Sequence, residues 1–309
     1  MSRINDSSIL PLSQYGGRWN PELTGVVPAD SGTSHMAVVD GEGNAVSLTS
    51  SVNTAFGSNV MSRSTGILFN NQMDDFSRPG APNAYHLVPA EANFIAPGKR
   101  PLSSMSPSML LLTTTAAVGN GSSTAAVGNG SSTAAVGNGS LPTGNGSSAV
   151  GNGSSAAKTN DGQQQQQRLR LVVGASNGPR ILTGIMQTVL RVLFQGMDPL
   201  AAVSAPRLHH QWLPQLCLFE NFTLNGVSFR EEGALVAGLA ARGNVMASYN
   251  DQLGDVQAIL LEQEGGSSIL NGTASNGTAA SGTATAAPVI TATAVSDPRK
   301  DGAPAAARG

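Results

Sequence analysis

Residues 33–52 read TSHMAVVDGEGNAVSLTSSV, two strand-like runs on either side of a turn. The runs from His35 to Asp40 and from Asn44 to Val52 alternate or are apolar, and they contain β-branched residues that favour extended backbone. Between them, Asp40-Gly41-Glu42-Gly43-Asn44 is rich in residues that form turns. This pattern predicts a β-hairpin, around which we expect the rest of the chain to be arranged.

The start of this hairpin carries the first chemical feature. If the chain were cut after Gly32, Thr33 would carry a free α-amine beside its own hydroxyl. A threonine hydroxyl is a poor nucleophile at neutral pH, and an N-terminal amine with a pKa of about 8 is one of the few built-in bases that can activate it. An ordinary hydroxyl at a strand edge, which satisfies backbone groups, is the commoner explanation of such a residue. The residues alone leave both alternatives open.

Further runs follow the hairpin in a fixed order. Together with Thr33 to Asp40, they are Gly43 to Val46, Asn53, Phe56-Gly57, Gly66 to Leu68, Asn70 to Phe76, Pro97 to Pro107, Ala205 to Pro214 and Ser296 to Lys300. These runs resemble the catalytic small subunit of the γ-glutamyltranspeptidase family. The resemblance implies an α/β (α+β) fold, the αββα sandwich of N-terminal-nucleophile hydrolases, which is incomplete without the large subunit. It also implies that residues 1–32 are the irregular tail of that large subunit.

The resemblance implies a catalytic role for several residues. Thr33 would attack the carbonyl of Gly32 to free its own amine. It would then attack a γ-glutamyl amide, and the acyl-enzyme would pass to water, an amino acid or a dipeptide. Ser51 would orient the nucleophile, and Asn177 and Gly178 would form the oxyanion turn. The implied substrate-binding residues are Asn53, Gln72 and Asp75 at the α-amino end of the substrate and Ser103 and Ser104 at its α-carboxylate.

The sequence departs from the family pattern at two of these positions. The family has threonine where Ser51 stands, and serine keeps the oxygen but loses the methyl group. The family has two glycines where Asn177-Gly178 stands, and asparagine is the non-glycine residue that best tolerates a positive φ. The resemblance also implies an arginine on the large subunit that grips the α-carboxylate, and no residue of that subunit's core is present in this sequence.

Composition limits the kinds of partner. Only 12% of residues are charged and the net charge is −2, which gives no electrostatic reason to expect nucleic acid or an anionic membrane as a partner. Cys217 is the single cysteine, so no intrachain disulfide can form. We expect small-molecule substrates, namely glutathione or other γ-glutamyl compounds with an amino acid or dipeptide acceptor. We expect no metal or organic cofactor, because the nucleophile brings its own amine.

The chain divides by composition. We expect catalytic core in residues 33–112 and 168–264, a C-terminal segment in 293–309, and low-complexity insertions in 113–167 and 265–292. The first insertion repeats AAVGNGSST with a nine-residue period. One valine per repeat cannot bury a solenoid core, and ordering costs roughly 1–2 kcal/mol per residue, so we expect both insertions to be disordered.

The second core part contains the remaining predicted elements. We expect a short strand at Leu169 to Val173, helices at Ile181 to Phe194 and Pro199 to Ser204, strand, helix and strand within Glu220 to Tyr249, and a strand at Asp255 to Leu261. Gly174 and Gly178 suggest a phosphate loop, but no Lys-Ser/Thr follows. His209-His210 suggests a metal site, but neighbours on an extended segment point to opposite faces, so we expect structural hydrogen bonds instead.

The function classes that remain are three. The leading hypothesis is a γ-glutamyl transferase and glutathione hydrolase. The alternatives are an inactive remnant or interaction module that retains the fold, and an amidohydrolase with another acyl specificity. The sequence as written has no apolar stretch of signal-peptide length and predicts a soluble chain, so the compartment stays unknown. The family resemblance implies the extracellular face of the plasma membrane, secretion or the vacuole.

Overall fold

The computed structural model describes residues 32–83, 87–116, 147–150, 157–158, 164–231, 233–263, 290–300 and 303–306. Nearly all of the predicted lead at 1–32, and most of the insertions at 113–167 and 265–292, lie outside these ranges. Their predicted disorder stays a prediction.

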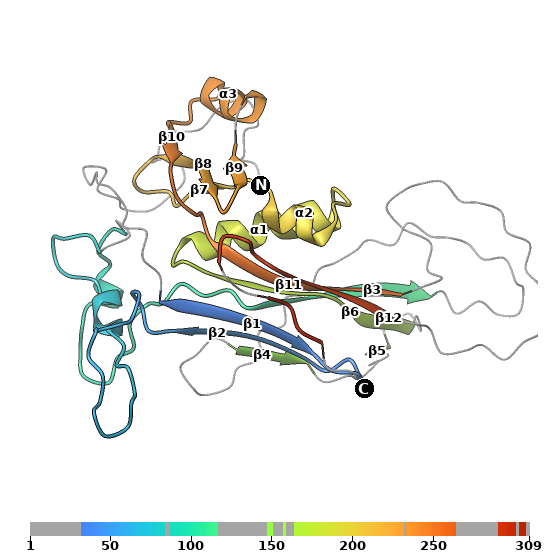
Figure 1. Cartoon of the computed structure of the whole chain (residues 1–309), viewed down its shortest axis with the longest axis horizontal. Helices are drawn as coiled ribbons and strands as arrows, with labels where there is room; N and C mark the ends of the chain where they lie inside the picture. Colours follow the sequence, from blue (N-terminus) through green and yellow to red (C-terminus); the bar gives the residue numbers. More distant parts are fainter. Residues whose placement is uncertain are drawn as a thin grey trace, which may run out of the picture.

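Two stacked β-sheets and two helices form the body of the described structure (Figure 1). The larger sheet has the order β12-β11-β6-β3, with β5 paired to β6, and the smaller has the order β1-β2-β4. The larger sheet contains β3 (Ser108–Ala116), β5 (Ala157–Lys158), β6 (Gln164–Ser176), β11 (Asp255–Gln263) and β12 (Ile290–Ser296). The smaller contains β1 (Thr33–Val39), β2 (Ala45–Ser51) and β4 (Ser147–Val150). The helices are α1 (Arg180–Leu193) and α2 (Pro199–Ser204), and they cover the side of the larger sheet that faces away from the hairpin.

The predicted hairpin is confirmed. β1 and β2 pair antiparallel with Thr33 opposite Ser51 and Val39 opposite Ala45. At the turn, the Asp40 carboxylate accepts hydrogen bonds from the backbone N–H groups of Glu42 and Asn44, at 2.9 and 2.8 Å. The register therefore brings the first residue of β1 directly against the last residue of β2.

The central strand β6 is buried on both faces. Leu171 and Val173 belong to the core beneath the helices, whereas Val172 packs toward the hairpin with Ala45 and Met109. All three β6 residues are fully buried. Because successive strand side chains point to opposite faces, this apolar run fills both layers of core at once.

The predicted helices are also confirmed. α1 buries Ile181, Ile185 and Val192 against the sheet, at the spacing expected of one helix face. α2 begins with Pro199 after Asp198, whose carboxylate accepts from the N–H groups of Leu200 and Ala201 at 2.9 and 3.1 Å.

A smaller lobe lies beyond the helices (Figure 1). It comprises β7 (Leu208–His210), β8 (Cys217–Leu224), β9 (Val227–Arg230), α3 (Ala234–Ala241) and β10 (Met246–Tyr249). The expected strand, helix and strand are here two strands, a helix and a strand. The additional hairpin turns at Asn225-Gly226, both of which have positive φ, the conformation that this dipeptide favours.

Two core strands, β3 and β6, extend into the stretch expected to be the low-complexity insertion, residues 113–167. β3 and β6 pair antiparallel from Ser108 to Ala116 on one side and Gln164 to Val173 on the other. Residues 113–116 and 164–167 thus form ladder hydrogen bonds, although their composition belongs to the insertion.

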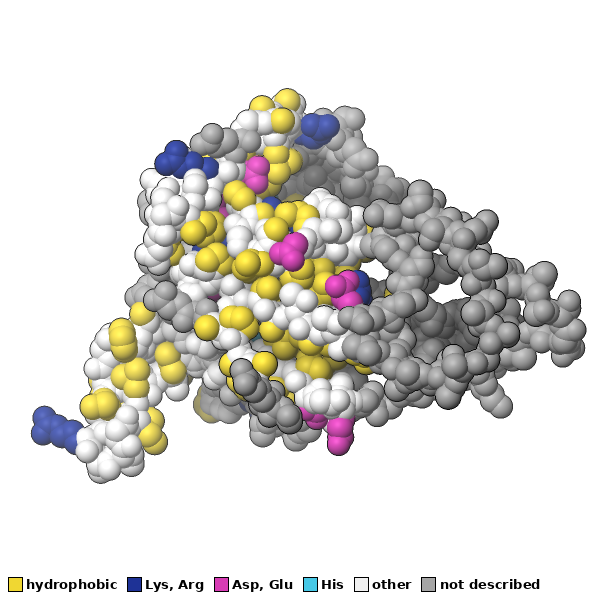
Figure 2. Space-filling view, turned by 45° about the vertical axis from the view of Figure 1, so that its right-hand side comes forward, with side chains coloured by type: hydrophobic (Ala, Val, Ile, Leu, Met, Phe, Trp, Pro, Cys, Tyr) yellow, Lys and Arg dark blue, Asp and Glu magenta, His cyan; other side chains and the backbone are white. Residues whose placement is uncertain are grey.

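In the segment between β2 and β3, the described residues form two short helical turns, η2 (Gln72–Asp75) and η3 (Glu91–Asn93), and a few isolated β-bridges. Figure 1 shows it gathered at the end of the sheets where β1 begins. Among the described residues no helix is long and apolar enough to cross a membrane. Figure 2 shows hydrophobic patches on one face with few charged groups between them, in keeping with the low charge content.

Candidate active site

Thr33 lies buried at the start of β1, with 6% of its surface exposed. Its hydroxyl oxygen is 2.9 Å from that of Ser51, and the Ser51 oxygen also accepts from the backbone N–H of Asn53 at 2.9 Å. The residue before it is fixed on both sides, because Gly32 donates to the Asn53 carbonyl at 2.8 Å and accepts from Val52 N–H at 3.0 Å. The hairpin thus holds the Gly32–Thr33 peptide bond next to a pair of hydroxyl groups.

Lys300 reaches the same residue from the other end of the chain. Its ammonium donates to the Thr33 carbonyl oxygen at 2.6 Å and to the Ser176 hydroxyl at 3.1 Å. Ser176 in turn donates to the Asp255 carboxylate at 2.9 Å. Burial, reinforced by the nearby Asp297 carboxylate, raises the pKa of Asp255 to about 6. The sequence alone assigns Lys300 no role, and its only signal is the Ser296 to Lys300 motif.

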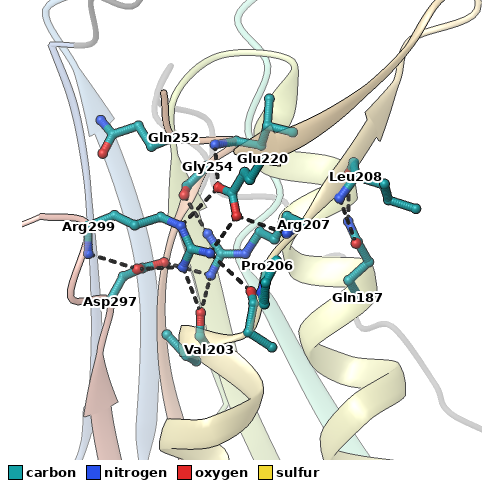
Figure 3. A network of polar contacts seen from close by, with 12 residues as sticks. Gln187, Val203, Pro206, Arg207, Leu208, Glu220, Gln252, Gly254, Asp297 and Arg299 are labelled. Atoms are coloured by element: carbon teal, nitrogen blue, oxygen red, sulfur yellow. Dashed lines mark hydrogen bonds and ion pairs between the residues drawn. The ribbon is translucent and has the colours of Figure 1, made fainter. Parts of the chain in front are cut away.

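A buried charge cluster fixes the segment that carries Lys300 (Figure 3). Arg299 contacts Glu220 at 2.6 Å and Asp297 at 3.1 Å, and Arg207 contacts Asp297 at 2.6 Å. All four side chains are fully buried. Burial raises the pKa of Asp297, but Arg207 and Arg299 outweigh that effect and hold the pKa below its usual value.

The residues expected at the α-amino end of the substrate form a connected chain. Asn53 is buried with φ +77°, and its amide donates to the Asn71 carbonyl at 3.2 Å. Next along the chain, Gln72 donates to the Asp75 carboxylate at 2.5 Å. Burial raises the pKa of Asp75 to about 6, against the lowering effect of that hydrogen bond. The Gln72 side-chain oxygen is buried and has no hydrogen-bond partner among the described residues.

Ser103 and Ser104 lie half-buried in the extended stretch before β3. Their connection to Asp75 runs through Asn93, which accepts from the backbone N–H of Leu102 and donates to the Asp75 carbonyl. Sequence reasoning from the family motif does not identify Asn93.

Asn177 and Gly178 form the turn between β6 and α1. Both have positive φ, +92° and +57°, and Asn177 is fully buried. The Asn177 side-chain oxygen accepts from Arg180 at 3.0 Å, and Arg180 also donates to the Tyr249 hydroxyl at 2.7 Å. The asparagine side chain is thus used within the protein to hold the turn. Lys300 donates both to Ser176, the last residue of β6, and to the Thr33 carbonyl oxygen. The turn of Asn177 and Gly178 follows Ser176 directly, so Lys300 connects the start of this turn to Thr33.

The histidines are engaged within the protein. His209 bonds Thr183 at 2.8 Å and Gln211 at 3.0 Å, and His210 accepts from the Trp212 N–H at 3.1 Å, as expected for structural histidines. Burial lowers the pKa of His209 to about 4. Within the described ranges no group of three or more His, Cys, Asp or Glu side chains is placed to hold a metal ion.

Comparison with known proteins places this chain in a family. A model of γ-glutamyltranspeptidase matches residues 1–132 and 163–307. Glutathione hydrolase 2 from Arabidopsis thaliana is 34% identical over 310 aligned residues, which cover 98% of this chain and 39% of that protein. Another Arabidopsis relative, glutathione hydrolase 4, is 36% identical over 221 aligned residues, which cover 71% of this chain and 85% of that protein. Its name presents it as a presumed inactive enzyme.

Solved structures agree. The γ-glutamyltranspeptidase of Pseudomonas nitroreducens complexed with L-DON superposes with a TM-score of 0.55 at 29% identity, covering 89% of this chain and 100% of that one. A mutant of the Helicobacter pylori enzyme gives 0.54 at 29% identity over 86% of this chain and 99% of that one. The chain has this mixed α/β fold over most of its length. It spans less than half the length of glutathione hydrolase 2. By sequence and fold alike, the chain belongs to the γ-glutamyltranspeptidase family.

Proposed function

We propose that this chain carries the catalytic small-subunit part of a γ-glutamyl transferase and glutathione hydrolase with Thr33 as nucleophile. The observation that carries the proposal is the pair of hydroxyl groups of buried Thr33 and half-buried Ser51, 2.9 Å apart, at a glycine–threonine bond fixed by the hairpin. A strand-edge hydroxyl with a purely structural role does not need a second hydroxyl and a lysine converging on the same residue.

The first step would be self-cleavage. The Thr33 hydroxyl attacks the Gly32 carbonyl carbon, the C–N bond breaks, and the Thr33 nitrogen takes the hydroxyl proton and becomes a free amine. Water then opens the resulting ester, which restores the Thr33 hydroxyl and releases Gly32 as a carboxylate. The Gly32 carbonyl oxygen already accepts from Val52 N–H at 3.0 Å, a donor suited to the developing oxyanion. Gly32 also fits tightly, since an added Cβ would lie 2.0 Å from the Thr54 carbonyl oxygen.

The second step would be acyl transfer. With its amine free, Thr33 has its own base, which takes the hydroxyl proton as the oxygen attacks the γ-carbonyl of the donor. The amide C–N bond breaks, the leaving amine takes the proton, and water or an acceptor amine then attacks the acyl-enzyme. The backbone amides of Asn177 and Gly178 are the proposed oxyanion donors, and losing one such donor costs on the order of 10²–10³ in rate.

The donor's headgroup would bind beside this centre. Asp75 offers a charge to the α-ammonium, with acceptors from Gln72 and Asn53, and the buried unpartnered oxygen of Gln72 supports this assignment. Ser103 and Ser104 would donate to the α-carboxylate. We propose that a large subunit supplies the remaining grip on that carboxylate and that the substrates are glutathione and other γ-glutamyl compounds.

Mass spectrometry of the expressed chain tests the nucleophile. We expect a new N-terminus at Thr33, its loss in Thr33→Ala, and hydrolysis of a γ-glutamyl anilide only by the cleaved form. Ser34→Ala is the matched control, because Ser34 is the next hydroxyl on β1 and is exposed. Cleavage that persists in Thr33→Ala would overturn the assignment.

A non-catalytic member of the family is the second candidate. Glutathione hydrolase 4 of Arabidopsis, of which the aligned region covers 85%, is named as a presumed inactive enzyme. Under this alternative the chain keeps the fold but stays uncut, and the wild-type mass spectrum alone decides between the two.

A further inference from the structure

The segment between η2 and β3 is organised around the side chain of Asn93. Its amide nitrogen donates to the Asp75 carbonyl oxygen at 2.8 Å and to the Ser77 hydroxyl at 3.2 Å. Its amide oxygen accepts from the backbone N–H of Leu102 at 2.9 Å. One side chain therefore spans two stretches of backbone that are 27 residues apart in sequence, positions 75 and 102.

Two of these three hydrogen bonds end on backbone next to a proposed ligand-binding group. One holds the backbone of Asp75 itself, and the other holds Leu102, the neighbour of Ser103. Neither uses the Asp75 carboxylate, which accepts from Gln72, or the Ser103 hydroxyl. Since Asn93 contacts only the backbone in these two places, it sets the spacing of the two groups without occupying either.

The turn that presents Asn93 is itself well fixed. Lys99 donates to the carbonyl oxygens of Ala92 and Phe94, both at 2.8 Å, and so closes the loop around Asn93. The Asn93 carbonyl also accepts from Ser77 N–H at 3.0 Å. By contrast, the Leu102 side chain is 63% exposed, so burial of that side chain does little to hold the stretch before Ser103. The Asn93 hydrogen bond is then a main constraint on its position.

We propose that Asn93 is a positioning residue that fixes the distance between the ammonium-binding and carboxylate-binding groups of the donor site. The inference rests on the proposed function, because it assigns a purpose to the spacing of Asp75 and Ser103. A γ-glutamyl headgroup carries its ammonium and carboxylate on one carbon atom, so both groups bind only if the two backbone stretches keep their separation.

Donor kinetics of the full chain and of three variants test the inference. Asn93→Ala removes all three side-chain hydrogen bonds, to Asp75, Ser77 and Leu102. Asn93→Asp keeps the acceptor for Leu102 N–H and places a second oxygen against the Asp75 carbonyl. Asn83→Ala is the matched control, since Asn83 lies in the same segment and its side-chain oxygen accepts from Leu87 N–H at 3.0 Å.

Three anilide donors distinguish the ammonium-binding group from the carboxylate-binding group. They are the γ-glutamyl donor, the glutaryl donor, which lacks the α-ammonium, and the 4-aminobutyryl donor, which lacks the α-carboxylate. In Asn93→Ala we expect KM for the γ-glutamyl donor to rise about tenfold with kcat within about threefold, and the preference over both truncated donors to shrink. In Asn93→Asp only the preference over the glutaryl donor should shrink. A loss of fold would instead lower activity toward all donors alike.

The outcomes separate this inference from the proposed function. A wild-type chain that neither cleaves itself nor binds the γ-glutamyl donor, measured by calorimetry, overturns both. A wild-type chain that uses the donor, with Asn93→Ala and Asn83→Ala showing equal KM values and equal donor preferences, overturns the role of Asn93 alone.

Discussion

If Asp75 binds the donor ammonium as proposed, protonation of its carboxylate competes with donor binding. Burial raises its pKa to about 6 in the free protein, and the Gln72 hydrogen bond and the Asp74 charge modify that value. A donor ammonium beside it stabilises the charged form, so binding lowers the pKa and expels a proton at pH values near 6. Donor affinity should therefore be full above pH 7 and fall about tenfold per unit as the pH drops below 6.

The measurement is KM for a γ-glutamyl donor between pH 4.5 and 8. Asp75→Asn should raise KM at pH 7.5 by at least about tenfold. It should also abolish the further rise of KM below pH 6, here called the acid limb of the KM profile. Asp74→Asn is the control: Asp74 pairs with the exposed Arg78 at 2.9 Å, so its loss should only move the limb to slightly lower pH. An acid limb that survives in Asp75→Asn would assign it to another group.

At this scale the sequence predicts residue types better than contacts. Thr33, Ser51 and Asp75 could be named because they stand in motifs whose order is readable along the chain. No role could be assigned to Lys300, although it stands in the Ser296 to Lys300 motif, because its partner Thr33 lies 267 positions away. Asn93 could not be identified for a similar reason, since its hydrogen bonds to the Asp75 carbonyl and the Leu102 N–H involve backbone atoms, which every residue has.

Among the elements, the contact of β1 with β6 depends on the absence of a side chain at Gly174. A Cβ there would lie 2.1 to 2.4 Å from three atoms of the His35 ring, which is well below any real contact. His35 also bonds Thr49 at 2.9 Å, and burial lowers its pKa to about 4, so the ring has little freedom to leave. Thr33 lies two residues away on the same strand.

Gly174→Ala should therefore destabilise the fold by about 1–3 kcal/mol and slow self-cleavage at Thr33. Adding His35→Ala should recover most of that loss, which a double-mutant cycle in denaturant would measure as a coupling energy. Gly184→Ala, in α1, is the control because its Cβ would meet Val256 at an ordinary 3.4 Å, and alanine favours helix by up to about 1 kcal/mol. Additive effects of Gly174→Ala and His35→Ala would contradict this packing.

The elements themselves were predictable where one local pattern decides them. The hairpin follows from two alternating runs and a turn, and α1 from its helical spacing. The hairpin of β8 and β9 is absent from the expected strand, helix and strand, although Asn225-Gly226 is a dipeptide that favours such a turn. The extension of β6 into the glutamine run had no local signal, since it depends on pairing with β3.

At the scale of the whole molecule, two apolar faces lie uncovered. One is the outer face of the hairpin, with Met36 51% and Val38 43% exposed. The other is a ridge along α1 at four-residue spacing, formed by Leu182, Met186, Leu190 and Phe194, each between 45% and 68% exposed. Contiguous exposed patches of this kind mark interaction surfaces. They agree with the proposed large-subunit partner of a chain that spans 39% of glutathione hydrolase 2.

The buried charge cluster joins the segment around Asp297 and Arg299 to Arg207 and Glu220 in the middle of the chain. Arg299 binds Glu220 through two hydrogen bonds, at 2.6 and 2.9 Å, and holds the backbone that carries Lys300 to Thr33. Arg299→Met leaves buried carboxylates short of a positive partner, which should cost about 3–5 kcal/mol of the free energy of unfolding. The partly exposed pair of Arg170 and Glu262, 3.1 Å apart, is the control, and Arg170→Met should cost at most about 1 kcal/mol.

Denaturant unfolding measures both values, and mass spectrometry follows cleavage at Thr33 in the same samples. Because Lys300 depends on this anchor, Arg299→Met should also slow cleavage under conditions where it is still folded. Equal unfolding free energies for the two variants would show that the cluster does not hold the C-terminal segment, and normal cleavage in a strongly destabilised Arg299→Met chain would separate the anchor from Thr33.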